Sequence, residues 1–212
     1  MFKNFSKDFW WGVAASGPQH EGGALEGGRE PSIWDKYYEM SSHRFFNEVG
    51  PQECGDFYHR FKEDISLLKE LNLSTYRTSI QWSRLLPYGT KTPNPDAVRF
   101  YNEVIDTMLE LGITPFMNLH HFDMPWSYQE KGGWENRDTV KEYRYFAEQC
   151  FKLFGDRVQH WFTFNEPIVV PYIAYVGDFL YPNVMDMQRA MTVAYHTSLA
   201  HAEAMDAFRQ GG

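Results

Sequence analysis

The sequence predicts an α/β fold made of the first four strand–helix units of a TIM (β/α)8 barrel. Short apolar runs alternate with amphipathic segments, which is the pattern of parallel strands joined by helices. An open parallel sheet of four strands has two exposed edges, which proteins normally avoid, and a closed parallel barrel needs eight strands. We therefore expect residues 1–212 to be a single domain that forms the N-terminal half of such a barrel.

The first unit is expected to begin with a strand over Phe9–Ala15, an apolar run that contains two tryptophans. Glycines from Gly22 to Gly28 indicate a loop, and Pro31–Tyr38 is expected to form a short aromatic turn. The glycines are not expected to form a phosphate loop, because they lack the strand-to-helix context and the lysine of that motif.

The first predicted helix covers Asp56–Leu71, where apolar residues recur at helical spacing. Asp56 is expected to cap its start, and Asn72 suits the left-handed conformation that ends a helix. Asn94 is expected to cap the second helix. The later elements are strands over Ser74–Trp82, Ile113–Leu119 and Val158–Phe164, and helices over Pro95–Leu111, Asp138–Phe154 and Met187–Phe208.

Composition and charge argue against several classes of partner. The net charge is −8 and no cluster of lysine and arginine is present, so no nucleic-acid partner is expected. No apolar run approaches the length of a membrane span, so no membrane partner is expected. The N-terminus lacks the apolar core of a signal peptide, and Cys54 and Cys150 are too few for a disulfide framework. These features predict a cytoplasmic protein.

The most informative motif is Thr163–Pro167, which reads Thr-Phe-Asn-Glu-Pro and follows a predicted strand. In a parallel barrel, active sites assemble at the carboxyl ends of strands. Glu166 is therefore the candidate general acid/base, and Asn165 can bind a substrate hydroxyl. Protonating a glycosidic oxygen at neutral pH requires a carboxyl with a raised pKa. Phe162, Phe164 and the following proline are expected to provide the apolar surroundings that raise it.

Three further polar residues lie at or within predicted strands. His121 ends the third strand, and strand alternation sends His120 to the opposite face, so at most one imidazole faces the barrel mouth. Gln19 follows the first strand, and its amide can donate to one sugar hydroxyl and accept from the next. Arg77 lies inside an apolar strand, so it either orients an active-site acid or points outward to the helices.

Each candidate also has a structural interpretation. Glu166 can be a loop carboxylate in water, His121 a satisfied core histidine and Gln19 an ordinary loop side chain. Aromatic residues make up 17% of the chain, which suits a sugar-stacking cleft as well as a core. Three tryptophans are each either a stacking platform or a loop anchor: Trp34, Trp126 and Trp134.

No metal and no other cofactor are expected. His196 and His201 are five residues apart rather than the four of a helical metal-binding pair, and no carboxylate cluster accompanies them.

Taken in order along nearly the whole chain, the motifs resemble glycoside hydrolase family 1, the retaining β-glycosidases. They are Phe9–Gly22, Tyr76–Arg84, Leu119–Pro125 and Thr163–Pro167. The resemblance implies that Glu166 is the acid/base and that Arg77 orients the nucleophile. It also implies three sugar-binding residues: Gln19, His121 and Asn165.

The motifs look most like the 6-phospho-β-glucosidase branch. Phe122 stands where the family commonly has tryptophan, and Gly17–Gln19 and Met117–Leu119 also resemble this branch. The resemblance therefore implies retaining hydrolysis of β-glucoside 6-phosphates. The family's nucleophile is a second glutamate on the seventh strand, so the isolated chain is expected to be inactive and to pair with a C-terminal half-barrel.

Three alternatives compete with this interpretation. The substrate can be a non-phosphorylated β-glucoside or β-galactoside. The chain can be a catalytically silent half-barrel that homodimerises through its open edges or binds sugar without cleaving it. It can also be a short enzyme whose nucleophile is Asp123 or Glu135.

Overall fold

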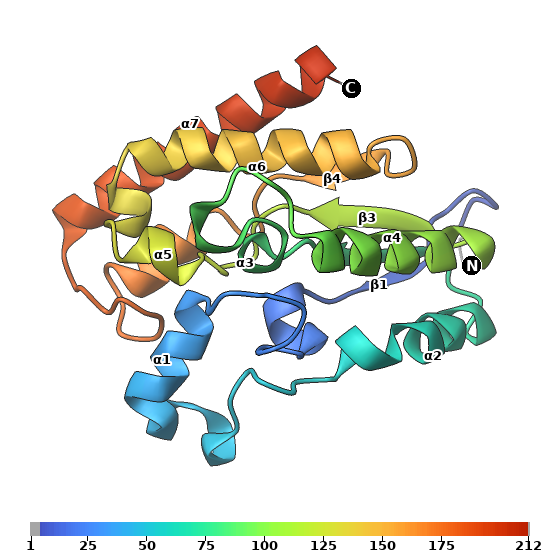
Figure 1. The fold of residues 1–212 in the computed structure, drawn as a ribbon, viewed down its shortest axis with the longest axis horizontal. Helices are drawn as coiled ribbons and strands as arrows, with labels where there is room; N and C mark the ends of the chain where they lie inside the picture. Colours follow the sequence, from blue (N-terminus) through green and yellow to red (C-terminus); the bar gives the residue numbers. More distant parts are fainter. Residues whose placement is uncertain (1–4, 212) are drawn as a thin grey trace.

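The fold is built around a parallel sheet in which the strands follow the chain order β1-β2-β3-β4 (Figure 1). We describe residues 5–211 in a computed structural model. The strands are β1 (Gly12–Ala14), β2 (Thr75–Ser79), β3 (Thr114–Asn118) and β4 (His160–Phe162). Consecutive parallel strands that pair in chain order form the repeating unit of a (β/α) barrel, which confirms the predicted fold class.

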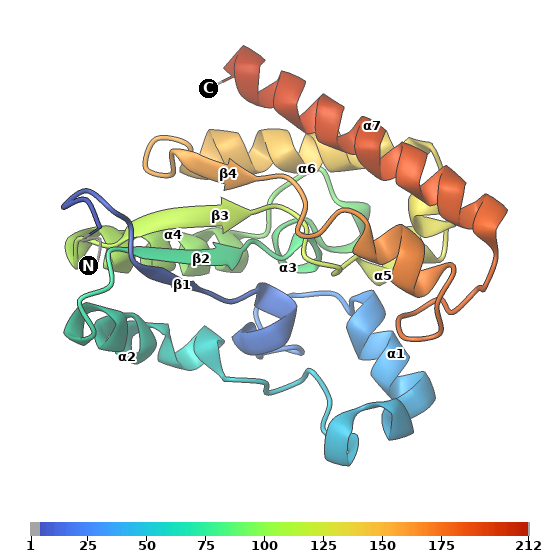
Figure 2. The same cartoon turned by 180° about the vertical axis from the view of Figure 1, so that it is seen from behind.

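Long helices follow β1 to β4 and pack on one face of the sheet, with α7 lying beside α6 (Figures 1 and 2). They are α2 (Phe57–Glu70), α4 (Pro95–Glu110), α6 (Asp138–Phe154) and α7 (Met187–Gly211). Asn94 caps α4 as predicted, because its side chain accepts a hydrogen bond from the Asp96 N–H.

Shorter elements gather at the carboxyl ends of the strands (Figure 2). They are the helices α1 (Ile33–Ser41), α3 (Trp82–Leu85) and α5 (Trp126–Gln129). Single turns of π- or 3-10-helix lie at Gly17–Glu21, Ser42–Arg44, Phe46–Glu48, Pro87–Gly89, Gly133–Glu135 and Val170–Ala174.

Two local predictions are wrong. The expected aromatic turn at Pro31–Tyr38 is the start of helix α1, whose N-cap Ser32 forms a capping box with Asp35. Asp56 does not cap α2, because its backbone is left-handed (φ 53°) and its carboxylate oxygen instead lies 2.6 Å from His59 Nδ1. Asn72 does adopt the predicted left-handed conformation (φ 56°).

The strands are shorter than predicted because the chain leaves the sheet to pack its aromatic residues. Trp82, expected at the end of the second strand, opens α3 and stacks on Phe146 of α6, with ring centroids 5.3 Å apart. Both rings are buried in the core between sheet and helices. Such an aromatic pair adds about 0.5–1.5 kcal/mol beyond the area it buries.

The other face of the sheet carries exposed apolar side chains. Figure 2 shows no helix in front of these strands. Trp10 is 54% exposed and Phe162 is 42% exposed, while β1 and β4 are the edge strands of the sheet in the described residues. An apolar surface next to open strand edges marks a contact surface. Across residues 5–211, none of the helices combines the length and the apolarity needed to cross a bilayer.

Candidate active site

The loops that carry the predicted site residues are joined at the carboxyl edge of the sheet. The Asn165 N–H donates to the His120 carbonyl at 2.9 Å, which extends the pairing of β3 and β4 beyond both strands. The Gly17 N–H donates to Ser79 Oγ at 2.8 Å, which ties the first loop to the end of β2. Motif residues from separate strands are thereby presented at one edge.

Glu166 lies just after β4, as predicted, but it is exposed within the described residues. The expected apolar enclosure is not formed there. Phe164 packs against buried Trp134, with ring centroids 5.4 Å apart, and Phe162 lies under Arg77. The Glu166 backbone is left-handed (φ 40°), which costs energy in a residue other than glycine. Such strain is common at functional sites, but nine other described residues besides glycine also have a positive φ, so the strain alone does not mark Glu166.

Arg77 points toward Glu166 and not outward. Its Nη2 donates to Asn165 Oδ1 at 2.9 Å, and its guanidinium lies 4.9 Å from the ring centroid of Phe162. Burial lowers the pKa of Arg77, and the nearby charge of Glu166 opposes that shift. The outward interpretation of Arg77 is therefore wrong. Because the Asn165 carbonyl is occupied, the Asn165 NH₂ remains available to donate to a substrate hydroxyl.

His121 is a neutral imidazole. Burial, reinforced by the charge of Arg77, lowers its pKa to about 4. The backbone N–H of His121 donates to Asp123 Oδ1 at 2.9 Å, and Asn118 Nδ2 lies 3.4 Å from the ring Nδ1 of His121. Asn118 Nδ2 also donates to the His120 carbonyl, which fixes this atom as the amide nitrogen. His121 Nδ1 therefore accepts, the ring proton lies on Nε2, and the ring presents a donor.

Asn118 is a positioning residue that the sequence reasoning missed. A polar side chain at the end of an apolar strand was the signal that pointed to His121, and Asn118 carries the same signal in β3. His120 behaves as strand alternation predicts. It packs among core aromatics, and the Trp134 indole donates to its Nε2 at 3.3 Å.

Gln19 lies in the turn Gly17–Glu21, and Ser16 Oγ donates to its Oε1 at 2.6 Å. Gln19 and His121 line one pocket, which joins the first and third strand ends. The remaining lining is largely apolar and comes from Pro18, Trp34, Phe45, Val49, Gly50, Pro51, Cys54 and Phe122. A pocket with a few polar groups on an aromatic lining is suited to a small polar ligand such as a sugar.

The other two tryptophans are anchors. Trp134 is buried in the core, and Trp126 packs on Tyr181 with ring centroids 5.7 Å apart. The alternative nucleophiles are also engaged. Asp123 is buried, its Oδ1 accepts from the backbone N–H of His121, and burial raises its pKa to about 6. Glu135 forms a two-point ion pair with Arg189.

Known proteins are similar to this chain in sequence. The family model for glycosyl hydrolase family 1 matches residues 1–212. The chain is 51% identical to the 6-phospho-beta-glucosidase GmuD of Bacillus subtilis, over 97% of this chain and 44% of that protein. It is 39% identical to beta-glucosidase A of Thermotoga maritima, over 98% of this chain and 46% of that protein.

Solved structures are similar to this chain in fold. The chain superposes on the family 1 β-glucosidase from Thermotoga maritima with a TM-score of 0.95 and 38% identity, covering 99% of this chain and 47% of that one. A complex of that β-glucosidase with castanospermine also matches with a TM-score of 0.95. The chain spans about half the length of the curated relatives it matches. That share agrees with four of the eight units of a (β/α)8 barrel.

Proposed function

The chain belongs to glycosyl hydrolase family 1, and from this premise we propose that it carries the proton-donating half of a retaining β-glycosidase. The observation that supports this most is Glu166 at a strand end, beside an Asn165 whose carbonyl is held by Arg77. A retaining mechanism uses two carboxyl groups about 5–5.5 Å apart. One attacks the anomeric carbon while the other protonates the leaving oxygen. Glu166 takes the second role, and as a carboxylate it then accepts a proton from the water that releases the sugar.

The neighbouring side chains bind and orient the sugar in this proposal. Gln19 and His121 hold hydroxyls from one pocket, and Asn165 donates to the hydroxyl next to the anomeric carbon. Arg77 orients the attacking carboxylate. Its Nε supports this role, because it is buried and has no hydrogen-bond partner among the described residues. A buried guanidinium N–H without a partner costs free energy until it meets an acceptor.

The attacking carboxylate comes, in this proposal, from a C-terminal half-barrel that pairs with β1 and β4 and covers the exposed face of the sheet. The state of Asp123 and Glu135 supports an external source, since Asp123 is buried and Glu135 is paired with Arg189. The uncovered Trp10 and Phe162 support a partner surface of matching apolar character. The same pairing would enclose Glu166 and supply the apolar surroundings that a proton donor needs.

The proposed substrate is a β-glucoside 6-phosphate. The higher identity to GmuD than to the β-glucosidase, 51% against 39%, and the phenylalanine at Phe122 support this choice over a non-phosphorylated β-glucoside or β-galactoside. A phosphorylated sugar is too polar to cross a bilayer unaided, so we place the reaction in the cytoplasm.

The test is to mix the 212-residue chain with a polypeptide that carries the last four units of GmuD. Hydrolysis of 4-nitrophenyl β-glucoside 6-phosphate should appear only in the mixture, and faster than hydrolysis of the unphosphorylated glucoside. Glu166→Gln should lose about 10²–10⁴-fold in rate on alkyl glycosides and much less on 2,4-dinitrophenyl glycosides, which need no protonation. The exposed Glu130→Gln is the matched control and should keep full rate on both.

Two results would contradict the proposal. Equal losses on good and poor leaving groups in Glu166→Gln would remove its role as the acid. A chain that sediments as a stable homodimer and gains no activity in the mixture would favour the silent half-barrel.

A further inference from the structure

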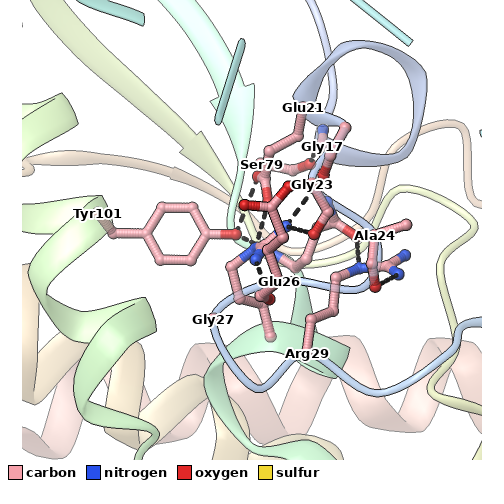
Figure 3. Close-up of polar contacts among 12 residues, drawn as sticks. Gly17, Glu21, Gly23, Ala24, Glu26, Gly27, Arg29, Ser79 and Tyr101 are labelled. Carbon is pink, nitrogen blue, oxygen red and sulfur yellow. Dashed lines mark hydrogen bonds and ion pairs between the residues drawn. The ribbon is translucent and has the colours of Figure 1, made fainter. Parts of the chain in front are cut away.

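Gln19, the proposed sugar ligand, is itself exposed, but the turn to which it belongs is fixed by several buried contacts. Within residues 5–211, the side chain of Gln19 forms one hydrogen bond, which it accepts from Ser16. Its neighbour His20 is fixed by a 2.8 Å contact between Nε2 and the Tyr76 hydroxyl. Figure 3 shows Glu21 and Tyr101 among the polar contacts on the buried side of the turn, where the Tyr101 hydroxyl donates to Glu21.

Glu21 is the buried end of the turn. Its Oε1 accepts from Arg84 Nε at 2.5 Å and its Oε2 accepts from the Tyr101 hydroxyl at 3.0 Å. The side chains of Arg84 and Glu21 are 0% and 2% exposed. Glu21 is therefore unavailable for proton transfer to a substrate, although it lies only two residues from Gln19.

Arg84 also bonds the backbone of the loop that follows the turn Gly17–Glu21. Its two terminal nitrogens donate to three backbone carbonyls, those of Gly22, Gly23 and Glu26, at 3.0–3.1 Å. Its guanidinium also stacks over the Tyr58 ring at 4.3 Å. Because the five donors of a guanidinium have fixed directions, these bonds are made together only when the loop has one conformation. A lysine at this position keeps the charge but cannot form all of these hydrogen bonds at once.

We propose that Arg84 and Glu21 are positioning residues for Gln19: the buried pair locks the turn Gly17–Glu21 so that the Gln19 amide is held by Ser16 and faces the pocket. A buried ion pair is a weak source of net stability, so conformational specificity is a reason to retain one. This inference rests on the proposed function for the role of Gln19 in binding sugar. The positioning itself is independent of that role.

The experiment follows the Gln19 side-chain amide by NMR in the ¹⁵N-labelled 212-residue chain, with the signal assigned through its loss in Gln19→Ala. In Arg84→Lys we expect the nuclear Overhauser contact between Ser16 and the Gln19 amide to be lost and the amide shift to move to that of a free carboxamide. Arg29→Lys is the matched control. Arg29 is buried in the same loop but bonds Gln81, Ala24, Ser32 and Asp35 and not Glu21. It should leave the Ser16–Gln19 contact intact.

An unchanged Gln19 signal in Arg84→Lys, or an equal change in Arg29→Lys, would overturn the inference. If Arg84→Lys does not fold, Tyr101→Phe removes one bond to Glu21 and should weaken the same contact; no effect there would also overturn the inference.

Titration with methyl β-glucoside 6-phosphate tests the sugar role of Gln19 separately. A Gln19 signal that fails to respond in the unmodified chain counts against the proposed function, whereas the variants still decide the positioning. Where binding is seen, Arg84→Lys should cause no further loss of affinity in the Gln19→Ala background.

Discussion

The two loops that carry the candidate site are built in opposite ways. The loop after β1, residues 17–35, is largely buried and crossed by ion pairs, with Arg84 bonded to Glu21 and Arg29 bonded to Asp35 at 2.8 Å. The loop after β4 is exposed around Glu166, which holds a strained left-handed backbone. The first loop is held by buried ion pairs within the described residues, and the second is incompletely surrounded.

The difference matches the two tasks proposed for these loops, sugar binding and proton donation. A residue that binds sugar, which is the role proposed for Gln19, benefits from a rigid frame, because less conformational entropy is lost when it binds. A proton donor needs a dry, apolar setting, and at β4 that setting depends on what covers the exposed face. The comparison predicts that substitutions in the first loop mainly change stability and that substitutions at Glu166 mainly cost activity.

The largest effect expected from this contrast is on Arg84. Arg84→Met should destabilise the chain by about 3–5 kcal/mol, because it leaves the Glu21 carboxylate buried without its partner. Urea unfolding followed by circular dichroism measures this change. The double variant Glu21→Leu/Arg84→Met should recover much of the loss, since neither charge then remains buried.

The control is an ion pair on the surface, where water solvates both charges. Lys141→Met removes the exposed partner of Asp138 and should leave the unfolding midpoint nearly unchanged. If Arg84→Met and Lys141→Met were equally mild, the first loop would not be the rigid part of the site and the comparison would break.

The next effect concerns Glu30, a buried carboxyl of the first loop that forms no ion pair among the described residues. Burial raises the pKa of Glu30 from 4.5 to about 7, although Ser127 donates to its Oε1 at 3.0 Å. The folded state therefore binds a proton more tightly than the unfolded state, and stability falls as the pH rises from about 4.5 through 7. Glu30→Gln removes this cost. It should stabilise the chain by about 2–3 kcal/mol at pH 8 and have little effect at pH 4.

Parallel urea titrations of both proteins at pH 4 and pH 8 measure this difference. Glu70→Gln, which makes the same substitution at an exposed carboxylate of α2, is the matched control. A Glu30→Gln curve that follows the unmodified protein at both pH values would contradict the prediction.

The alternation of apolar runs and capped helices is sufficient to predict the four strand–helix units. Helix α6 begins and ends at the predicted residues, because its apolar spacing is regular and Gly155 follows its last turn. Helix α1 is harder to predict, because aromatic residues in a short segment do not distinguish a helix from a turn. Its Ser32–Asp35 capping box is the sequence signal that identifies it.

The site is predictable in part. Because parallel strands end at one edge, the sequence places Gln19, His121 and Glu166 near each other without showing their partners. Arg77 meets Asn165, 88 residues away, and such a contact depends on the register of three strands. The burial of Glu21 is equally non-local, since Arg84 lies 63 residues further along the chain. Long-range side-chain pairs of this kind leave no periodic signal in the sequence.

The smallest effect concerns Glu166 itself and tests the other half of the comparison. At a φ of 40°, a side chain with a Cβ is strained, and glycine is not. Glu166→Gly should therefore be more stable than Glu166→Ala by about 1 kcal/mol, the reverse of the usual order of the two residues. Both variants should lack hydrolytic activity in the reconstituted barrel, because both lack the carboxyl. Thermal or urea unfolding of the two variants measures the difference. If Glu166→Ala were the more stable, the backbone at Glu166 would carry no strain. The site after β4 would then not give up stability for activity, and this half of the comparison would fail.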